Sequence, residues 1–551
     1  TEVDVNLVPD AKNTINEVVV IGYGAVKKSD LTGSVSNVKM SDIRDVPNTS
    51  VDQALQGRIA GVDIMSTSGA PGATTSIRVR GTRSISASND PLIVVDGVID
   101  AVSDLNDINS ADIEQISVLK DASSTAIYGS RGANGVIVIT TKSGRSGRTN
   151  INYRNQFGFS FLVDYIDMMN SEQNLQYQLQ CVMSEPNSNF YPMMQYLKRE
   201  MDGTASEADL ARLAKARATD TDWMDLMTQT GFLQEHSVSV SGGSDKTRFF
   251  ISGSYLTQQG ILKKSSLDRY STRFNIDHKA TKWLDLGLKA TVGYSKTNFA
   301  DPEAGAGRQN WGNPWFTTLL AYPYESPDDW YNVDNPTLIT KYYDRETGRL
   351  KTVASVYAKA SITDWLSVKT NFGLDFMYNR NVSTLHRDHP NAQQNHGYYG
   401  QTSSELFRYT WTNTINVNKD FANGHSLNAV AGMEMFQGKW YTSNFTGYDL
   451  NSDMMQSPAG IGDKSGSSLF PPSIGGGRTM SNLMSFFAQA SYSIANKYNF
   501  SASLRHDTSS KFYEDNASAT FWSVGASWLI SSESWFDNAK STLVNYRGWP
   551  V

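Results

Sequence analysis

Three glycines with two residues between each consecutive pair, Gly129, Gly132 and Gly135, form the pattern in this chain that most invites a phosphate-binding interpretation. A dinucleotide-binding loop needs a strand first, then the glycines, then a helix that they open. Here the order is reversed, because Asp121 can cap a short helical turn, the glycines break it, and the β-branched run 136–141 follows. The spacing therefore predicts a glycine-rich connection into a strand and no nucleotide site.

A group of histidines invites a second chemical interpretation, a metal site. The residues concerned are His386, Asp388, His389 and His396. Zinc sites need a fixed geometry and supporting hydrogen bonds to the ligands, whereas histidines in a polar segment are usually only polar. The single cysteine, Cys181, excludes a disulfide framework and a thiolate cluster. No Ser/His/Asp or paired-carboxylate pattern stands out either, so we expect neither an enzyme nor a cofactor.

Aromatic residues gather in two long, otherwise polar connections and form the third candidate site. They are Trp311, Trp315, Trp330 and Tyr331 in the first connection, and Tyr398 and Tyr399 in the second. Aromatic faces stack on sugar rings, and they also bury well at protein interfaces. We expect these residues in loops, where contact with a partner protein or packing within the loop is favoured over direct ligand contact.

Composition limits the class of protein that must position these residues. The chain has 551 residues, and it contains no apolar stretch of about twenty residues that would make a transmembrane helix. It is nevertheless rich in aromatic residues and glycine, which suits an all-β protein, including a barrel whose strands face a polar lumen on one side. A net charge of −6 without a basic stripe gives no reason to expect nucleic-acid binding.

From residue 149 onward the chain reads as about twelve amphipathic strands. Between Leu284 and Tyr294, for example, apolar residues alternate with polar ones, and several such segments approach the ten residues that cross a bilayer obliquely. The connections alternate strictly in length. Short ones lie near 242–247, 278–282, 363–365, 419–424 and 495–498, and long ones near 163–230, 256–268, 296–350, 379–404, 437–481 and 507–519. Short turns at one rim and long loops at the other predict an antiparallel transmembrane β-barrel.

The residues before this region read differently. Residues 32–144 combine short strands and a helix in a compact α+β domain, and residues 1–8 alternate like the last strand of a preceding domain. A linker, 9–31, joins the two. It contains the extended hydrophobic segment Glu17–Ile21, which can pair with the edge of a partner sheet, although spacing alone favours an ordinary internal strand.

The end of the chain carries a further expectation. Residues 532–551 lead toward a strand that does not follow, and twelve strands leave two open edges. An open edge is not viable in hydrocarbon, so we expect the sequence to stop before the barrel closes.

Particular segments resemble the plug of the SusC/RagA class of TonB-dependent outer-membrane transporters. They are EVVVIGYGAVKKSDLTGSVSNV, ALQGRIAGVDI, IRVRGT, DPLIVVDGV and IEQISVLKDASSTAIYGSRGANGVIVITTK, in the family's order between residues 17 and 144. The barrel matches more loosely, through stretches such as SVSGGSDKTRFFISGSYLTQQGI.

The resemblance implies a mainly β fold. An N-terminal α+β plug (32–144) precedes a barrel (149–531) that holds about twelve of an expected complement of about 22 strands. Residues 1–8 would end a carboxypeptidase-regulatory-like domain, and residues 532–551 form a tail. The TonB box would be Glu17, Val18, Val19, Val20 and Ile21.

The resemblance also implies a function and partners. The function is active import of oligomeric nutrients across the outer membrane of a Gram-negative, Bacteroidota-like cell, with oligosaccharides the first expectation. The partners are TonB with its ExbB/ExbD energy source, a SusD-like lipoprotein lid and outer-membrane lipid. The alternatives are a peptide importer of the same class, or a surface receptor or signal transducer on the same barrel.

Overall fold

The computed structural model describes most of the chain. The described residues are 18–27, 32–40, 50–66, 68–101, 105–163, 166–185, 190–298, 314–328, 335–392, 395–451, 457–462, 471–533 and 535–536. Within these ranges, the helices are all too short or too polar to cross a bilayer.

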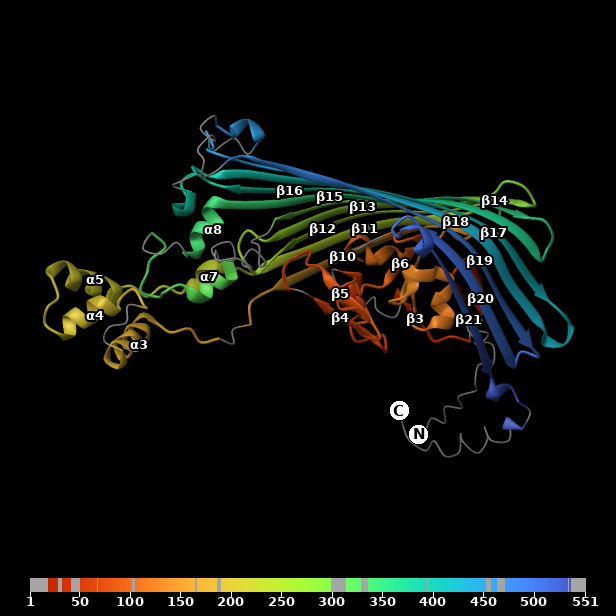
Figure 1. The fold of residues 1–551 in the computed structure, drawn as a ribbon, viewed down its shortest axis with the longest axis horizontal. Helices are drawn as coiled ribbons and strands as arrows, with labels where there is room; N and C mark the ends of the chain where they lie inside the picture. Colours follow the sequence, from red (N-terminus) through yellow and green to blue (C-terminus); the bar gives the residue numbers. More distant parts are fainter. Residues whose placement is uncertain are drawn as a thin grey trace, which may run out of the picture.

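One antiparallel sheet of twelve strands dominates the molecule, and each strand pairs with its neighbours in the sequence (Figure 1). The strands are β10 (Gly147–Ser160), β11 (Gly231–Gly243), β12 (Thr247–Gln259), β13 (Ser266–Lys279), β14 (Leu284–Asn298), β15 (Tyr343–Ser361), β16 (Leu366–Leu385), β17 (Tyr398–Asp420), β18 (Ser426–Tyr448), β19 (Ser473–Ile494), β20 (Tyr498–Ser509) and β21 (Ser518–Trp528). The predicted strand count is confirmed. The connections at one rim are longer than their neighbours at the other, but three predicted long ones are shorter than predicted because the strands extend into them, and they comprise 260–265, 386–397 and 510–517. β10 and β21 form the two edges of the sheet, which does not close on itself in the described residues.

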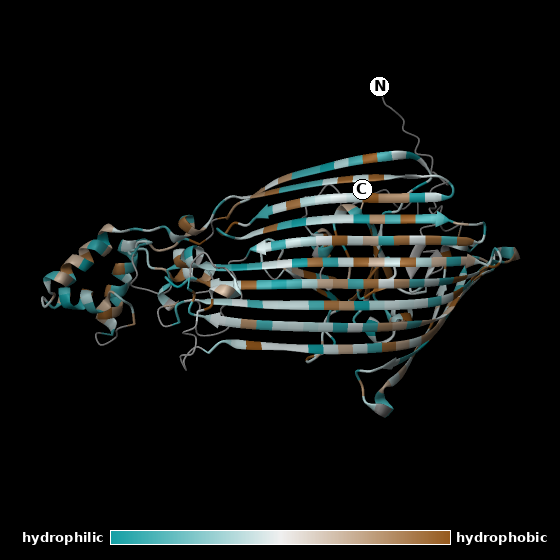
Figure 2. Ribbon diagram, turned by 90° about the horizontal axis from the view of Figure 1, so that it is seen from above, coloured by the Kyte–Doolittle hydropathy of each residue, from teal (hydrophilic) through white to brown (hydrophobic). Residues whose placement is uncertain are grey.

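The face of this sheet that points away from the plug is apolar and the opposite face is polar, so brown and teal segments alternate along the strands in Figure 2. Exposed side chains on the outer face include Ile251, Phe274, Leu288, Val356 and Phe372. Trp283, directly before β14, and Tyr294 on β14 mark the two limits of this band. At 3.3 Å per residue and a strand tilt near 40°, the height between them is about 28 Å. That height matches the apolar band of about 25 Å that transmembrane barrels present to lipid.

The N-terminal domain lies on the concave side of the wall, which is the name we give to the twelve-stranded sheet (Figure 1). Its core is a five-stranded sheet with the order β3 (Val35–Lys39), β8 (Ile113–Leu119), β9 (Val136–Thr141), β6 (Leu92–Val95), β7 (Val98–Ile99). The hairpin β4 (Val62–Ser66) and β5 (Thr75–Val79) and the helix α1 (Val51–Leu55) complete it. This confirms the α+β domain that the sequence predicted.

The glycine-rich connection behaves as the sequence predicted. Asp121 caps the short helix α2 (Ala122–Thr125) by accepting a 3.0 Å hydrogen bond from the backbone N–H of Ser124. Gly129 then has φ +63°, and a Cβ there would collide with the carboxylate of Asp507 on the wall. The glycine therefore allows the plug backbone to approach the wall closely.

Most of the helices occupy the long connections at one rim (Figure 1, left). α3 (Ser171–Ser184), α4 (Met194–Met201), α5 (Glu207–Ala218) and α6 (Trp223–Met227) lie between β10 and β11, whereas α7 (Pro314–Leu320) and α8 (Pro336–Tyr342) lie between β14 and β15. The two connections pack together: Trp223 Nε1 donates to the Tyr322 carbonyl at 2.9 Å, and Gln178 Nε2 donates to the Tyr324 hydroxyl at 3.0 Å. We call α3–α7 the rim helices.

Candidate functional site

The segment predicted to be the TonB box forms one arm of a small hairpin. β1 (Val18–Ile21) pairs antiparallel with β2 (Gly24–Lys27) in a sheet separate from both the plug sheet and the wall. Gly22, with φ +61°, makes the tight turn between them. Glu17, the first residue of the predicted box, lies outside the described residues.

Tyr23, at the turn of this hairpin, connects the hairpin to the wall. Its hydroxyl donates to Glu434 Oε2 on β18 at 2.6 Å and accepts from Arg505 Nη1 on β20 at 2.9 Å. Its ring stacks on Phe487 of β19, with centroids 4.0 Å apart and planes inclined by 16°. Three adjacent wall strands therefore hold a single residue that lies two positions after Ile21.

Arg505 is the centre of this contact, and its guanidinium is completely buried. Besides Tyr23 it donates to Asp507 Oδ1 at 2.6 Å, to Ser485 Oγ at 2.8 Å, to the Ile127 carbonyl of the plug at 2.9 Å and to Glu434 Oε1 at 3.1 Å. All these acceptors match the planar fork of an arginine, which presents five donors. The side chain thus joins the plug to the wall.

The cluster balances its charges. Arg131 of the plug also pairs with Glu434, so two arginines face two carboxylates, Glu434 and Asp507. Burial, reinforced by the Glu434 carboxylate, raises the pKa of Tyr23 well above its usual value, so the hydroxyl keeps its proton and acts as a donor. A buried charge that loses its partner costs several kcal/mol, so the members of this cluster depend on one another. We call Tyr23, Arg131, Glu434, Arg505 and Asp507 the latch cluster.

A second contact between plug and wall has the opposite polarity. Asp96 of the plug pairs with Arg273 of β13 and, at 3.3 Å, with Lys289 of β14. Burial raises the pKa of Asp96, but Lys289 and Arg273 outweigh it and hold the pKa below its ordinary value. Asp107 pairs in the same way with Arg349 at 2.7 Å. Acidic plug residues therefore face basic wall residues here, whereas the basic Arg131 faces an acidic wall residue. A plug rotated in the lumen would place like charges opposite each other, so this arrangement favours the observed orientation of the plug.

The aromatic residues predicted in the loops are only partly described. Trp315 is half-buried in α7, and Trp311, Trp330 and Tyr331 lie outside the described residues. The prediction that Tyr398 and Tyr399 lie in a loop is wrong, because β17 begins at Tyr398 and pairs with β16 and β18 along this stretch.

Tyr398 and Tyr399 also have different surroundings, because successive strand residues point to opposite faces. Tyr398 packs with Tyr343, Leu385 and Ala392 on the plug side. Tyr399 is fully buried on the other face, where its hydroxyl donates to Gln401 Oε1 at 3.0 Å. The two residues therefore cannot serve one common ligand site.

The histidine group does not form a cluster of ligands. Within the part of the chain that the structure describes, no three His, Cys, Asp or Glu side chains are arranged to hold a metal. His396 instead contacts Asp449 at 2.9 Å, and His389 is buried beside the ring of Tyr342. Burial lowers the pKa of His389 to about 4.

Sequence reasoning missed the latch cluster. Alternation places Glu434 and Arg505 on the polar face of their strands, which is a usable signal. It does not reveal their partner, because Tyr23 and Glu434 are 411 residues apart in the chain.

The sequence is similar to a known domain family and to several curated proteins. Residues 27–136 match the TonB-dependent Receptor Plug Domain. TonB-dependent receptor P26 of Formosa agariphila is 31% identical over 98% of this chain and 53% of its own length. TonB-dependent receptor SusC of Bacteroides thetaiotaomicron is 29% identical over 99% of this chain and 54% of its own length. The chain thus spans about half the length of the curated relatives it matches.

Solved structures agree with this result. The RagAB peptide importer in its "open-open" state has a TM-score of 0.77 and 26% identity, with 93% of this chain and 58% of that chain covered. The ferric citrate transporter FecA shares the fold alone, with a TM-score of 0.54 and 10% identity over 90% of this chain and 60% of that one.

Proposed function

The chain belongs to the SusC/RagA class of TonB-dependent receptors, and from that premise we propose that it imports oligomeric nutrients across the outer membrane with energy supplied through TonB. The observation that carries the proposal is the connection between the β1–β2 hairpin and the latch cluster. An extended segment that is linked to both plug and wall is a suitable handle for a protein that must displace the plug. Residues 32–144 would be that plug, and 149–531 the part of the barrel wall present here.

The proposed TonB contact is strand pairing along Glu17–Ile21. Within the described residues, β1 has β2 on one edge and no strand on the other. A strand added to an open edge gains affinity from main-chain hydrogen bonds and tolerates changes of side chain. The short run Val18–Ile21 fits this mode of recognition.

The latch cluster can transmit a force on β1 to the plug. Force on β1 reaches Tyr23 through the backbone, and Tyr23 shares Arg505 with the carbonyl of Ile127 in the plug. Removing Tyr23 from this site takes one partner each from Glu434 and Arg505. The contact between plug and wall is thereby weakened at the glycine-rich connection, and the polar, Gly- and Ser-rich plug can rearrange in a wet lumen.

The test uses the full-length receptor and a matched pair of substitutions. Val20 pairs with Ala25 at a non-hydrogen-bonded position, so its N–H points to the open edge of β1. Val20→Pro removes this backbone donor and should abolish uptake of the cognate nutrient, as should deletion of Glu17–Ile21. Val20→Ser keeps the backbone donor and should retain uptake. All three proteins should reach the cell surface in equal amounts. Normal growth of the deletion strain on the nutrient would overturn the proposal.

The proposed cargo is an oligosaccharide, and a peptide is the second candidate. The similarity to the SusC receptor and to the RagAB peptide importer supports one class of large, oligomeric nutrient without separating the two. Uptake of labelled glycan fragments and of labelled peptides by the same strain distinguishes them. Competition by peptides alone would reject the oligosaccharide.

The proposed partner is a SusD-like lipoprotein that covers the rim with the long connections. The rim helices support this assignment, because they project beyond the strands there. Met183 of α3 and Phe190, between α3 and α4, are exposed apolar residues. Crosslinking from a photoreactive residue at position 190 should capture the lipoprotein encoded beside the receptor. A residue at the opposite rim, such as position 421, should not.

A further inference from the structure

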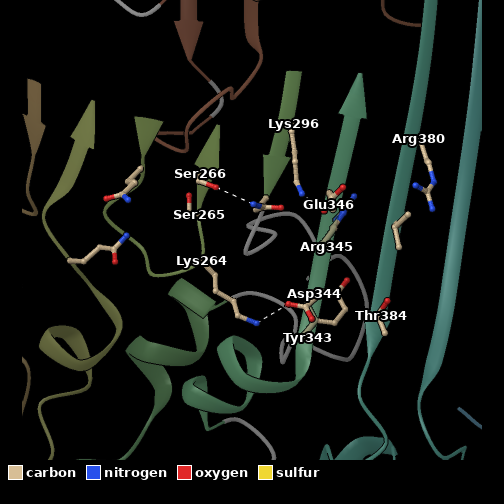
Figure 3. Close-up of a pocket in the computed structure, with 14 residues that line it drawn as sticks. Lys264, Ser265, Ser266, Lys296, Tyr343, Asp344, Arg345, Glu346, Arg380 and Thr384 are labelled. Carbon is tan, nitrogen blue, oxygen red and sulfur yellow. Dashed lines mark hydrogen bonds and ion pairs between the residues drawn. The ribbon is translucent and has the colours of Figure 1, made fainter. Parts of the chain in front are cut away.

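A recess of about 650 Å³ lies at the rim with the long connections, and it is lined mainly by charged and polar side chains (Figure 3). Its charged members are Lys264, Lys296, Asp344, Arg345, Glu346 and Arg380. The strand residues that line the recess belong to β12–β16, so neither edge strand, β10 or β21, contributes to it.

The recess opens on the outer surface of the wall and not on the lumen. Thr297 of β14 lies beside Gly72 of the plug, and Arg349 of β15 binds Asp107 of the plug, so these positions point inward. Lys296 and Glu346 occupy the alternate positions of the same strands and therefore point outward. Apart from Tyr343 and Arg345, the strand residues that line the recess share this outward register.

The height of the recess on the wall is fixed by a row of outward tyrosines. Tyr255 pairs with Tyr270 and Tyr270 with Tyr294, and Tyr378 lies two strands beyond in the same row, across Leu350 of β15. Lys296 and Arg380 lie two positions beyond their own strand's tyrosine toward the long connections, and Thr384 lies six positions beyond. At about 3.3 Å per residue and a strand tilt near 40°, this places the recess roughly 5–15 Å beyond the row along the membrane normal. Aromatic rows of this kind mark the edge of the hydrocarbon, so the recess lies at the depth of the lipid headgroups.

The charges in the recess suit an anionic group. Lys264 contacts Asp344 and Lys296 contacts Glu346, each at 2.8 Å, and both lysine side chains are about two-fifths exposed. Ion pairs exposed to this degree contribute little stability, so these lysines can exchange partners readily. Among the residues that the structure describes, Arg380 makes two long hydrogen bonds, of 3.3 Å to Gln401 and 3.4 Å to Tyr399. Its planar fork binds phosphate oxygens well.

We propose that this recess binds the phosphate-bearing headgroup of an outer-leaflet lipid, with Lys264, Lys296 and Arg380 as the phosphate contacts. The two carboxylates, Asp344 and Glu346, keep the lysines ordered in the absence of the lipid. The site anchors the wall at a defined height and lies apart from the path of the cargo. This inference depends on the outer-membrane location in the proposed function, but not on the TonB box or on the identity of the cargo.

The experiment measures lipid phosphate retained by the full-length receptor after detergent extraction and washing. The triple variant Lys264→Gln, Lys296→Gln and Arg380→Gln should retain about tenfold less, as expected when charge-assisted hydrogen bonds are lost. The control is Lys419→Gln, which removes an outward lysine at the opposite rim, over the ring of Trp365. It should retain the wild-type amount.

Two further measurements complete the experiment. One distinguishes a lipid headgroup from inorganic phosphate, and the other distinguishes loss of lipid binding from loss of uptake. Washing with millimolar inorganic phosphate should not release the lipid, because the acyl chains of the lipid also contact the apolar outer face of the wall. Release by inorganic phosphate alone, or equal retention by the triple variant and Lys419→Gln, would overturn the proposal. The variant that lacks Glu17–Ile21 should retain the lipid while losing uptake. The test of lipid binding therefore gives its answer even if the proposed TonB-dependent uptake is refuted.

Discussion

The hydroxyl of Tyr23 donates a 2.6 Å hydrogen bond to Glu434, and this bond ties the second residue after the predicted TonB box to the wall. Because the contact joins a short hairpin to three strands of a large sheet, a substitution at Tyr23 can weaken it without disturbing either fold. It therefore provides the most direct tests of how the plug is held.

Replacing Tyr23 by Phe should loosen the β1–β2 hairpin while preserving the stacking on Phe487. The lost hydrogen bond to a carboxylate is worth about 1.5–3 kcal/mol, so the hairpin should open more than tenfold more often. Hydrogen exchange of residues 18–27 measures this opening. Tyr153→Phe, which removes a hydroxyl from the outer face, is the control and should leave the exchange unchanged. Equal protection in both variants would contradict the prediction.

Replacing Glu434 by Gln should destabilise the receptor far more than a surface change does. Arg131 and Arg505 would then face one carboxylate instead of two, and breaking a buried ion pair costs about 3–5 kcal/mol. Thermal unfolding of the purified receptor measures the loss. Adding Arg131→Gln should recover part of it, because residues that share a network are not additive. Full additivity of the two substitutions would show that they do not interact.

Replacing Gly129 by Ala should be costly for two reasons. The residue has φ +63° and ψ −145°, a conformation close to the region that is essentially confined to glycine and costs other residues about 1–3 kcal/mol, and its Cβ would meet the carboxylate of Asp507. Gly57→Ala is the control for a positive φ in open space, since Gly57 has φ +72° and nothing within 4 Å. Gly129→Ala should lower the unfolding free energy more than Gly57→Ala does. If both variants lost the same stability, the close approach of plug and wall would be unsupported.

His389 should make the connection between β16 and β17 sensitive to acid. Burial lowers its pKa to about 4 in the folded protein, against about 6.5 in the unfolded chain. The unfolded state therefore binds the proton more readily, so local stability is complete above pH 6.5 and falls as the pH drops toward 4. Hydrogen exchange of residues 386–397 at pH 7 and pH 5 should show faster opening at pH 5. His389→Phe should remove that difference, and an unchanged pH response in this variant would refute the assignment.

Much of the wall could be predicted from the sequence, because alternation of apolar and polar residues has a direct physical cause. A strand such as Leu284–Asn298 buries one face against polar plug groups and shows the other to lipid. The method failed at Tyr398–Glu405, where QTSSE has no apolar face although the stretch is fully paired in β17. There the strands extend beyond the band of exposed apolar residues, and backbone pairing together with polar contacts such as Gln401 with Ser403 maintains the sheet.

The candidate site was less predictable than the fold. The box at Glu17–Ile21 was identified only through resemblance, since its spacing fits any internal strand. The latch cluster depends on contacts such as Arg505 with Ile127, 378 residues apart, which no local pattern encodes. Polar residues on strands could be assigned to the inner face, but their pairing depends on how the plug is rotated in the lumen.

The four residue pairs of the β1–β2 hairpin determine the order in which contacts fail under load. Tension applied before Val18, with the chain held beyond Lys27, acts first on the pair Val18–Lys27 at the open end of the hairpin. Each further pair carries load only after the previous one has parted, and Tyr23, at the closed end, is reached last. The hairpin therefore absorbs a force of short duration by reversible separation of its two strands. Only a sustained force reaches the bond between Tyr23 and Glu434.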